Sequence, residues 1–146
     1  MRPVRAIVLA AGQGKRMKSN KPKVLHEVLG RAILSRVMDA VGAAAGTALG
    51  YEGLEHLHLV VGHSAEIVTD FVVSNPPPCP FSTHLQSPQL GTGHAVMQVM
   101  PALEGFEGTL IVTVGDAPVF QANTLAELLA THREKNAVIT ALSTVA

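Results

Sequence analysis

The sequence predicts an α/β fold with an open, mostly parallel sheet that is flanked by helices. Four short apolar runs, at residues 4–9, 57–61, 109–114 and 137–145, are rich in Val, Ile and Leu. Continuous apolar runs of this length are typical of parallel strands that are covered on both faces. Segments with helical spacing lie between them, so strand and helix alternate. Ligands of such sheets bind beyond the carboxyl ends of the strands, which makes the loops there the candidate site.

The first apolar run predicts a buried strand. The apolar residues 6–11 follow two arginines, as the core of a secretory signal would, but the stretch is short and leads directly into a cluster of basic residues. No apolar run reaches the roughly 18–20 residues that span a bilayer, and the single Cys79 has no partner for an internal disulfide. We therefore expect a cytoplasmic protein without a membrane segment, and we assign Cys79 no role.

Four segments between and after the first strands have helical spacing and predict helices: residues 32–45, 65–73, 94–103 and 125–135. The last is preceded by Thr124, with Glu127 three positions later, which is a capping-box pattern. Two segments interrupt the alternation and predict connections. Residues 46–53 are rich in small side chains, and the prolines between residues 76 and 80 predict a stiff surface turn.

The composition indicates one domain with a small-molecule partner. The 146 residues suffice for a single compact core. Eleven basic residues balance eleven acidic ones, so no overall field attracts nucleic acid or an anionic membrane. Any attraction for phosphate must therefore be local.

The first candidate loop spans residues 9–17 and reads Leu-Ala-Ala-Gly-Gln-Gly-Lys-Arg-Met. Its small residues allow backbone N–H groups to approach an anion, and a cluster of lysines and arginine follows. A dinucleotide fingerprint would need glycine at Met17, and a Walker A loop would need serine or threonine at Arg16. Both known motifs fail, so a phosphate-binding loop and a tight turn with solvated lysines remain as alternatives.

The second candidate loop runs from Gln86 to the segment Gln89-Leu-Gly-Thr-Gly-His-Ala, in which glycines precede a predicted helix. The helix start offers unpaired N–H groups, and the glutamine amides carry both donors and acceptors, which match the edge of a nucleobase. The alternative is that the two glutamines are merely solvated.

The third candidate loop contains Asp116, directly after the apolar run 109–114. Mg²⁺ commonly binds one or two carboxylates together with substrate phosphates, so one aspartate is enough to begin a site. A turn or capping aspartate is the alternative. The seven histidines are scattered, and although His56 and His58 share a predicted strand face, we predict no zinc site and no catalytic triad.

Read together, four motifs resemble the sugar-1-phosphate nucleotidyltransferase family, and within it the amino-terminal uridyltransferase (pyrophosphorylase) domains of the bifunctional GlmU enzymes. The motifs are the loop at residues 9–17, Lys-Pro-Lys-Val-Leu-His at 21–26, the Gln-Leu-Gly-Thr-Gly-His-Ala segment at 89–95, and Val-Gly-Asp-Ala-Pro at 114–118. The first motif is shared with MobA-like NTP transferases, whereas the second and third are more specific to GlmU. The resemblance implies a Rossmann-like nucleotide-diphospho-sugar transferase fold.

The resemblance also implies an enzyme that joins UTP and N-acetylglucosamine 1-phosphate into UDP-N-acetylglucosamine, a cell wall precursor, and releases pyrophosphate, with Mg²⁺ as cofactor. It assigns catalysis to Arg16 and Lys23 and the metal to Asp116. The implied nucleotide-binding residues are Leu9, Ala10, Ala11, Gly12, Gly14, Gln86, Gln89, Gly91 and Thr92.

The resemblance covers nearly the whole chain but only the front of the family's domain. We expect the sugar-binding part and the β-helix acetyltransferase domain of GlmU to be absent, with the apolar strand at 137–145 left at an open edge. A homo-oligomer or a further carboxyl-terminal part would cover that edge. Two alternatives remain open: a non-catalytic nucleotide-binding fragment, or a nucleotidyltransferase for another base or sugar phosphate.

Overall fold

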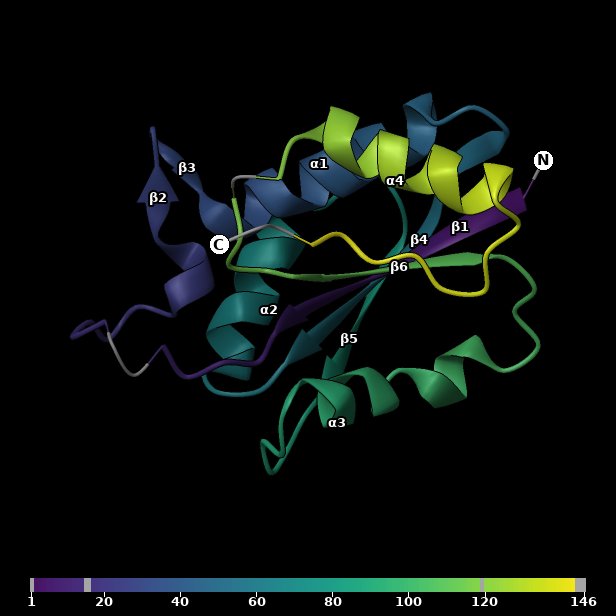
Figure 1. Ribbon diagram of the computed structural model, residues 1–146. Helices are drawn as coiled ribbons and strands as arrows, with labels where there is room; N and C mark the ends of the chain where they lie inside the picture. Colours follow the sequence, from purple (N-terminus) through teal and green to yellow (C-terminus); the bar gives the residue numbers. More distant parts are fainter. Residues whose placement is uncertain (1, 15–16, 119, 144–146) are drawn as a thin grey trace.

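The computed structural model describes residues 2–14, 17–118 and 120–143. Its centre is a parallel sheet of four strands in the order β5-β4-β1-β6 (Figure 1). The strands are β1 (Arg2–Ala10), β4 (Tyr51–Val61), β5 (Phe81–Leu85) and β6 (Thr109–Val114). Their last residues are paired in register, so all four carboxyl ends meet at one edge of the sheet.

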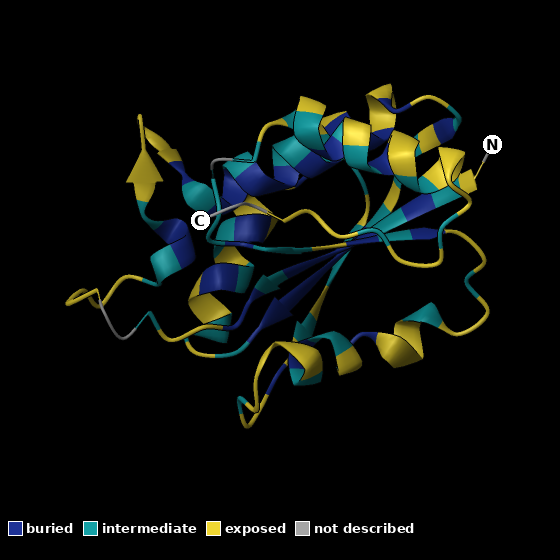
Figure 2. Ribbon diagram, viewed as in Figure 1, coloured by how far each residue is buried: buried dark blue, intermediate teal, exposed yellow. Residues whose placement is uncertain are grey.

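Helices cover both faces of the sheet, which confirms the predicted fold class. On one face, α1 (Ile33–Thr47) and α2 (Ala65–Ser74) pack on the sheet, and α4 (Ala122–Glu134) packs against α1. All three helices contribute to the larger apolar core. On the other face, α3 (Thr92–Met97) and the 3-10 turn η2 (Met100–Leu103) contribute to a smaller cluster with Ile7 and Val60. Figure 2 shows the burial concentrated on α1 and the inner strands. None of the described helices is long and apolar enough to cross a membrane.

A small projection follows the first loop. It contains the 3-10 turn η1 (Lys23–Leu25) and a short hairpin. The two antiparallel strands of this hairpin, β2 (Glu27–Val28) and β3 (Arg31–Ala32), have two residues each. Val24 and Leu25 are buried in the larger core, so they fix η1 and hold Lys23 in place beside them.

Several predicted boundaries need correction. The segment 46–53 is not one connection: α1 continues to Thr47, and β4 already begins at Tyr51. The predicted helix at 94–103 is divided into α3 and η2. The capping box at Thr124 is wrong, because α4 begins at Ala122 after Gln121 and has no side-chain cap.

The predicted strand at 137–145 is wrong over residues 137–143, which form no strand, while residues 144 and 145 lie outside the described residues. A strand needs the backbone of a neighbour, and no ladder hydrogen bond joins this segment to β6 in the described part of the chain. The segment instead crosses beside α4 and β6, where His132 Nδ1 lies 2.9 Å from Thr140 Oγ1 (Figure 1). Val138 and Ile139 are 94% and 83% exposed.

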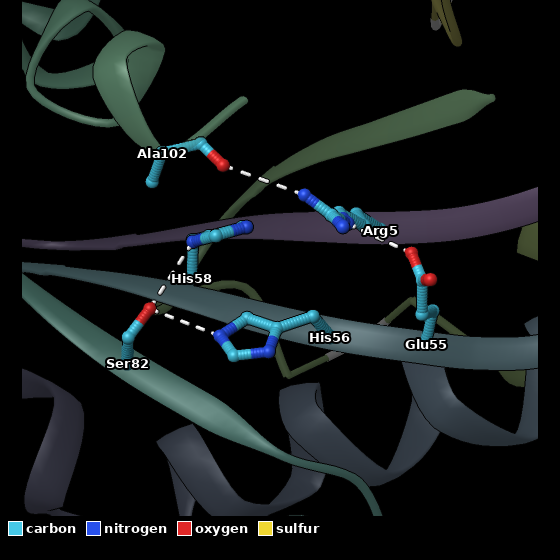
Figure 3. A network of polar contacts seen from close by, with 6 residues as sticks. All are labelled: Arg5, Glu55, His56, His58, Ser82 and Ala102. Carbon is cyan, nitrogen blue, oxygen red and sulfur yellow. Dashed lines mark hydrogen bonds and ion pairs between the residues drawn. The ribbon is translucent and has the colours of Figure 1, made fainter. Parts of the chain in front are cut away.

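A histidine network lies on the sheet face that α3 and η2 cover. Ser82 Oγ lies 3.0 Å from His56 Nε2, 3.2 Å from His58 Nδ1 and 3.1 Å from His84 Nε2. Figure 3 shows Ser82 between His56 and His58. His58 is buried, and its Nε2 atom has no hydrogen-bond partner among the residues that the structure describes. Burial, followed by the neighbouring His56, His84 and Arg5, lowers the pKa of His58 to about 4.

This network predicts a loss of stability in mild acid. The pKa of His58 is about 4 in the folded chain against 6.5 ordinarily, so the unfolded chain binds more protons between those values. The contribution of the neutral His58 side chain to the free energy of unfolding is therefore complete above about pH 6.5, and it decreases as the pH falls. We expect His58 alone to remove roughly 2 kcal/mol of unfolding free energy between about pH 7 and pH 5. Urea unfolding at several pH values measures this loss of unfolding free energy.

The variant His58→Phe removes the titrating ring and should flatten that pH dependence, whatever it does to the absolute stability. His63→Asn is a matched control because His63 is exposed. An equally steep pH dependence in His58→Phe and the wild type would contradict the assignment.

Candidate active site

A cavity of about 550 Å³ lies at the carboxyl edge of the sheet. Its walls come from the loops after β1, β5 and β6, together with η1 and the start of α3. The sequence predicted that the loops after β1 and β6 would meet, because the carboxyl ends of parallel strands share one edge. It predicted no strand before the loop that follows β5, and the structure adds that strand. The described residues that line the cavity are Leu9, Ala10, Ala11, Gly12, Gly14, Met17, Lys23, Val24, Gln86, Gln89, Gly91, Thr92, Ala95, Val114 and Asp116.

All but one of the site residues predicted from the sequence line this cavity. The exception is Arg16, which lies outside the described residues, as does Lys15. The structure thus brings together residues that are up to 107 positions apart, between Leu9 and Asp116. The roles assigned to the individual side chains stay predictions.

The loop after β1 adopts a conformation that requires glycine at one position. Gly14 has φ of +58°, in the left-handed region that side chains disfavour. A Cβ atom there would also lie 3.0 Å from Lys23 Cβ. The loop backbone therefore packs directly against the residue that carries the nearby positive charge.

Lys23 and Asp116 form an ion pair inside the cavity. Lys23 Nζ lies 2.6 Å from Asp116 Oδ2, and the two side chains are 41% and 37% exposed. A pair this accessible contributes below about 1 kcal/mol to stability. Its importance is chemical, because it sets one cation and one carboxylate side by side where both remain accessible to a ligand.

The loop after β5 presents its two glutamines differently. Gln86 is buried, and its Nε2 donates to Gly91 O at 2.9 Å and lies 3.1 Å from His94 Nδ1. Gln89 is partly exposed, and its Nε2 donates to Ala11 O at 2.5 Å. The second loop is therefore tied to the first through a side chain, and neither glutamine is merely solvated.

The sequence reasoning missed Gly62, which follows β4. A Cβ atom at Gly62 would lie 2.7 Å from Gln89 Nε2 and 3.0 Å from Ala11 O. Gly62 therefore leaves room for the contact between the two loops. Its position directly after the apolar run 57–61 was the available signal, but only the tertiary structure shows what lies against it.

Comparison with known proteins decides which family has this architecture. Residues 6–145 match the model of the MobA-like NTP transferase domain, which is nearly the whole chain. The chain belongs to the MobA-like NTP transferase family. The match includes all three loops around the cavity, so the cavity of this NTP transferase domain lies within the matched region.

The sequence is also similar to bifunctional GlmU proteins, which confirms the predicted resemblance. It is 43% identical to that of Pelobacter propionicus over 144 residues, covering 98% of this chain and 29% of the relative. It is 46% identical to that of Gloeobacter violaceus over 138 residues, covering 94% and 28%. This NTP transferase domain therefore spans less than a third of the curated relatives it matches.

Solved structures share the fold. A nucleotidyl transferase from Methanothermobacter has a TM-score of 0.66 and 22% identity, over 88% of this chain and 57% of that chain. The inositol-1-phosphate CTP transferase from T. maritima has a TM-score of 0.54 and 21% identity, over 77% and 43%. At these identities the likeness concerns the fold of the NTP transferase domain.

Proposed function

We propose that this domain binds UTP and Mg²⁺ and forms the nucleotide half of an enzyme that makes UDP-N-acetylglucosamine. The observation that supports this most is the convergence of a glycine-containing loop, two glutamines and a Lys–Asp pair on one cavity. In the proposed reaction, a phosphate oxygen of N-acetylglucosamine 1-phosphate forms a bond to the α-phosphorus of UTP. The bond from the α-phosphorus to the bridging oxygen breaks, and pyrophosphate leaves.

The loop after β1 and Lys23 would hold the triphosphate. Backbone N–H groups around Gly12 and Gly14 can donate to phosphate oxygens without side chains in the way. The Lys23 ammonium would neutralise the charge that develops at the α-phosphate, and Arg16 would add a second cation. Catalysis of this kind depends on alignment and charge stabilisation, so no protein nucleophile is required.

Gln86, Gln89, Gly91 and Thr92 would contact the uracil and ribose. Both glutamines keep an amide oxygen that has no protein donor in the described part of the chain. An amide oxygen accepts a hydrogen bond from the N–H group of a base. The arrangement therefore favours a base that presents a donor to this wall.

Asp116 fits the proposed Mg²⁺ site. A single accessible carboxylate suits Mg²⁺, which prefers substrate phosphates and waters for its remaining ligands. The described residues include no group of three or more His, Cys, Asp or Glu side chains that would hold a metal by themselves. When bound, Mg²⁺ would neutralise phosphate charge; the contribution of the chain is to hold the carboxylate beside Lys23.

Calorimetric titration of the chain with UTP and Mg²⁺ tests the proposal, with pyrophosphate release in the presence of N-acetylglucosamine 1-phosphate measured on the same samples. We expect saturable 1:1 binding of UTP. Tighter binding of CTP or GTP would favour a nucleotidyltransferase for another base. No binding of any nucleoside triphosphate by a folded chain would contradict the proposal.

Gly62→Ala is expected to weaken UTP binding about tenfold. The new methyl group would displace the Gln89 amide from Ala11 O, which would loosen the loop after β1. The calorimetric Kd measures this effect. Gly46→Ala, at an exposed position of α1 with open space around its Cβ, is the matched control and should bind like the wild type. Equal affinities of the two variants would contradict the role of Gly62.

A further inference from the structure

His94 lies beside the cavity but outside the residues that line it, and the proposed function gives it no role. It belongs to α3, and its Nδ1 lies 3.1 Å from Gln86 Nε2. On the opposite edge of the ring, the Gln98 amide lies 3.2 Å from Nε2 and donates to the His94 carbonyl oxygen at 2.9 Å. The imidazole therefore lies between two amide groups, and one of these belongs to the wall of the cavity.

The partners of Gln86 determine which way its amide group faces. Gly91 O can only accept a hydrogen bond, so the atom 2.9 Å from it must be the amide nitrogen. That nitrogen also lies 3.1 Å from His94 Nδ1, and the Gln98 nitrogen lies 3.2 Å from His94 Nε2, but a neutral imidazole accepts at only one of its two nitrogens. We assign the shorter contact as the hydrogen bond, with Nδ1 as the acceptor and the ring proton on Nε2, while Gln98 donates to the His94 carbonyl oxygen. Two acceptors together hold the nitrogen on one side, so the oxygen takes the other side.

The amide oxygen of Gln86 is open to the cavity. The residue as a whole is only 4% exposed, and it lines the cavity. In the described part of the chain this oxygen has no protein donor, and the one buried side-chain N or O atom without a partner is Nε2 of His58. Solvent or a ligand therefore reaches the Gln86 oxygen from the cavity.

We propose that His94 is a positioning residue: it keeps the Gln86 oxygen turned into the cavity, where this oxygen selects a pyrimidine base that carries a ring N–H. Uracil has an N–H at position 3, whereas cytosine has a lone pair there, which an amide oxygen repels. The inference rests on the proposed function, because it assigns the base-discriminating role to a residue outside the cavity wall.

His94 contributes to the orientation of the Gln86 amide group. Without His94, the Gln86 nitrogen keeps Gly91 O as its partner and loses the second acceptor. The amide group can then turn over more easily, which presents its N–H₂ group to the cavity and matches the cytosine lone pair. Loss of one such restraint should lower the preference for UTP over CTP about tenfold.

The test compares the Kd values of UTP and CTP by calorimetry in the full chain. His94→Leu removes the acceptor at similar volume, and His94→Asn keeps an acceptor, Oδ1, close to the position of Nδ1. We expect the wild type and His94→Asn to prefer UTP, and His94→Leu to lose most of that preference. Met97→Leu, at an exposed position of the same helix, is the control for general effects on α3.

The ratio of the two Kd values separates positioning from structural support, since a loosened α3 would weaken UTP and CTP equally. An unchanged ratio in His94→Leu overturns the role of His94 and leaves the proposed function intact. A wild-type chain that binds UTP and CTP with equal Kd values likewise overturns the role of His94 and leaves the proposed function intact. A wild-type chain that binds neither nucleotide overturns both the proposed function and this inference.

Discussion

Replacing Lys23 with methionine is expected to slow pyrophosphate release from UTP by a factor of about 10²–10³. Methionine keeps an unbranched apolar chain but removes the ammonium, which in the structure lies 2.6 Å from Asp116 Oδ2 inside the cavity. The proposed transition state gathers negative charge at the α-phosphate, and the loss of a positioned cation is costly there. The initial rate with N-acetylglucosamine 1-phosphate and Mg²⁺ measures the effect, and the calorimetric Kd of UTP should rise about tenfold.

Lys21→Met is the matched control, because Lys21 is exposed and does not line the cavity. It removes the same charge from the same segment, so it reports any general effect of net charge on UTP attraction. A change below about threefold in Lys23→Met, or equal changes in both variants, would contradict the role of Lys23.

Thermal stability should be nearly the same in the wild type and Lys23→Met. The Lys23–Asp116 pair is more than a third exposed on both sides, and such pairs contribute below about 1 kcal/mol. Val24 and Leu25, which anchor η1 in the core, are unaffected by the change. A large loss of rate with unchanged unfolding would therefore locate the effect in the chemistry of the cavity.

The parallel sheet and the position of the cavity could be predicted from the sequence for a physical reason. β1 and β6 follow continuous apolar runs of the sequence, and their carboxyl ends meet because parallel strands end at the same edge. This topology alone places Gly12 and Asp116 in one region. The contact of Lys23 with Asp116, 93 residues apart, depends instead on how η1 packs against the core, and no periodicity encodes that.

The two errors about strands have opposite causes. β5 was missed because it is a short edge strand, and its Ser82 and His84 belong to a polar network that hides the usual apolar pattern. The segment 137–143 was predicted as a strand because it is apolar, although the described structure provides it with no ladder partner. Local composition reports how apolar a segment is, whereas pairing depends on neighbours that are distant in sequence.

The structure decides between the two alternatives for Gln89 in the second candidate loop, and it adds a residue that the sequence analysis had given no role. Gln89 could have been a solvated turn residue, but its bond to Ala11 O makes it a connector between two loops. The sequence analysis quoted His94 within the motif at residues 89–95 but gave it no role, because its importance lies in the acceptor it offers to Gln86, and hydrogen-bond direction is a property of the folded site. Arg16 lies outside the described residues, and its catalytic role stays a prediction.

Replacing Asp116 with asparagine is expected to make UTP binding weaker than in the wild type when Mg²⁺ is present, and at least as tight as in the wild type when Mg²⁺ is absent. With Mg²⁺ present, the variant should bind UTP at least tenfold more weakly, because asparagine offers the metal no negative charge. Without Mg²⁺, it should bind UTP as tightly as the wild type or more tightly. The substitution removes a carboxylate that repels the triphosphate, and it frees Lys23 from its 2.6 Å ion pair. Calorimetric titrations with Mg²⁺ and with a chelator measure both affinities.

Such a crossing of affinities cannot arise from a damaged fold, because misfolding weakens binding under both conditions. Asp70→Asn is the matched control, since Asp70 is exposed on α2 and does not line the cavity. It should behave like the wild type with and without Mg²⁺. An Asp116→Asn chain that responds to Mg²⁺ as the wild type does would mean that the metal is held elsewhere. In that case the ion pair with Lys23 would be the principal role of Asp116, with the carboxylate orienting the lysine toward the substrate.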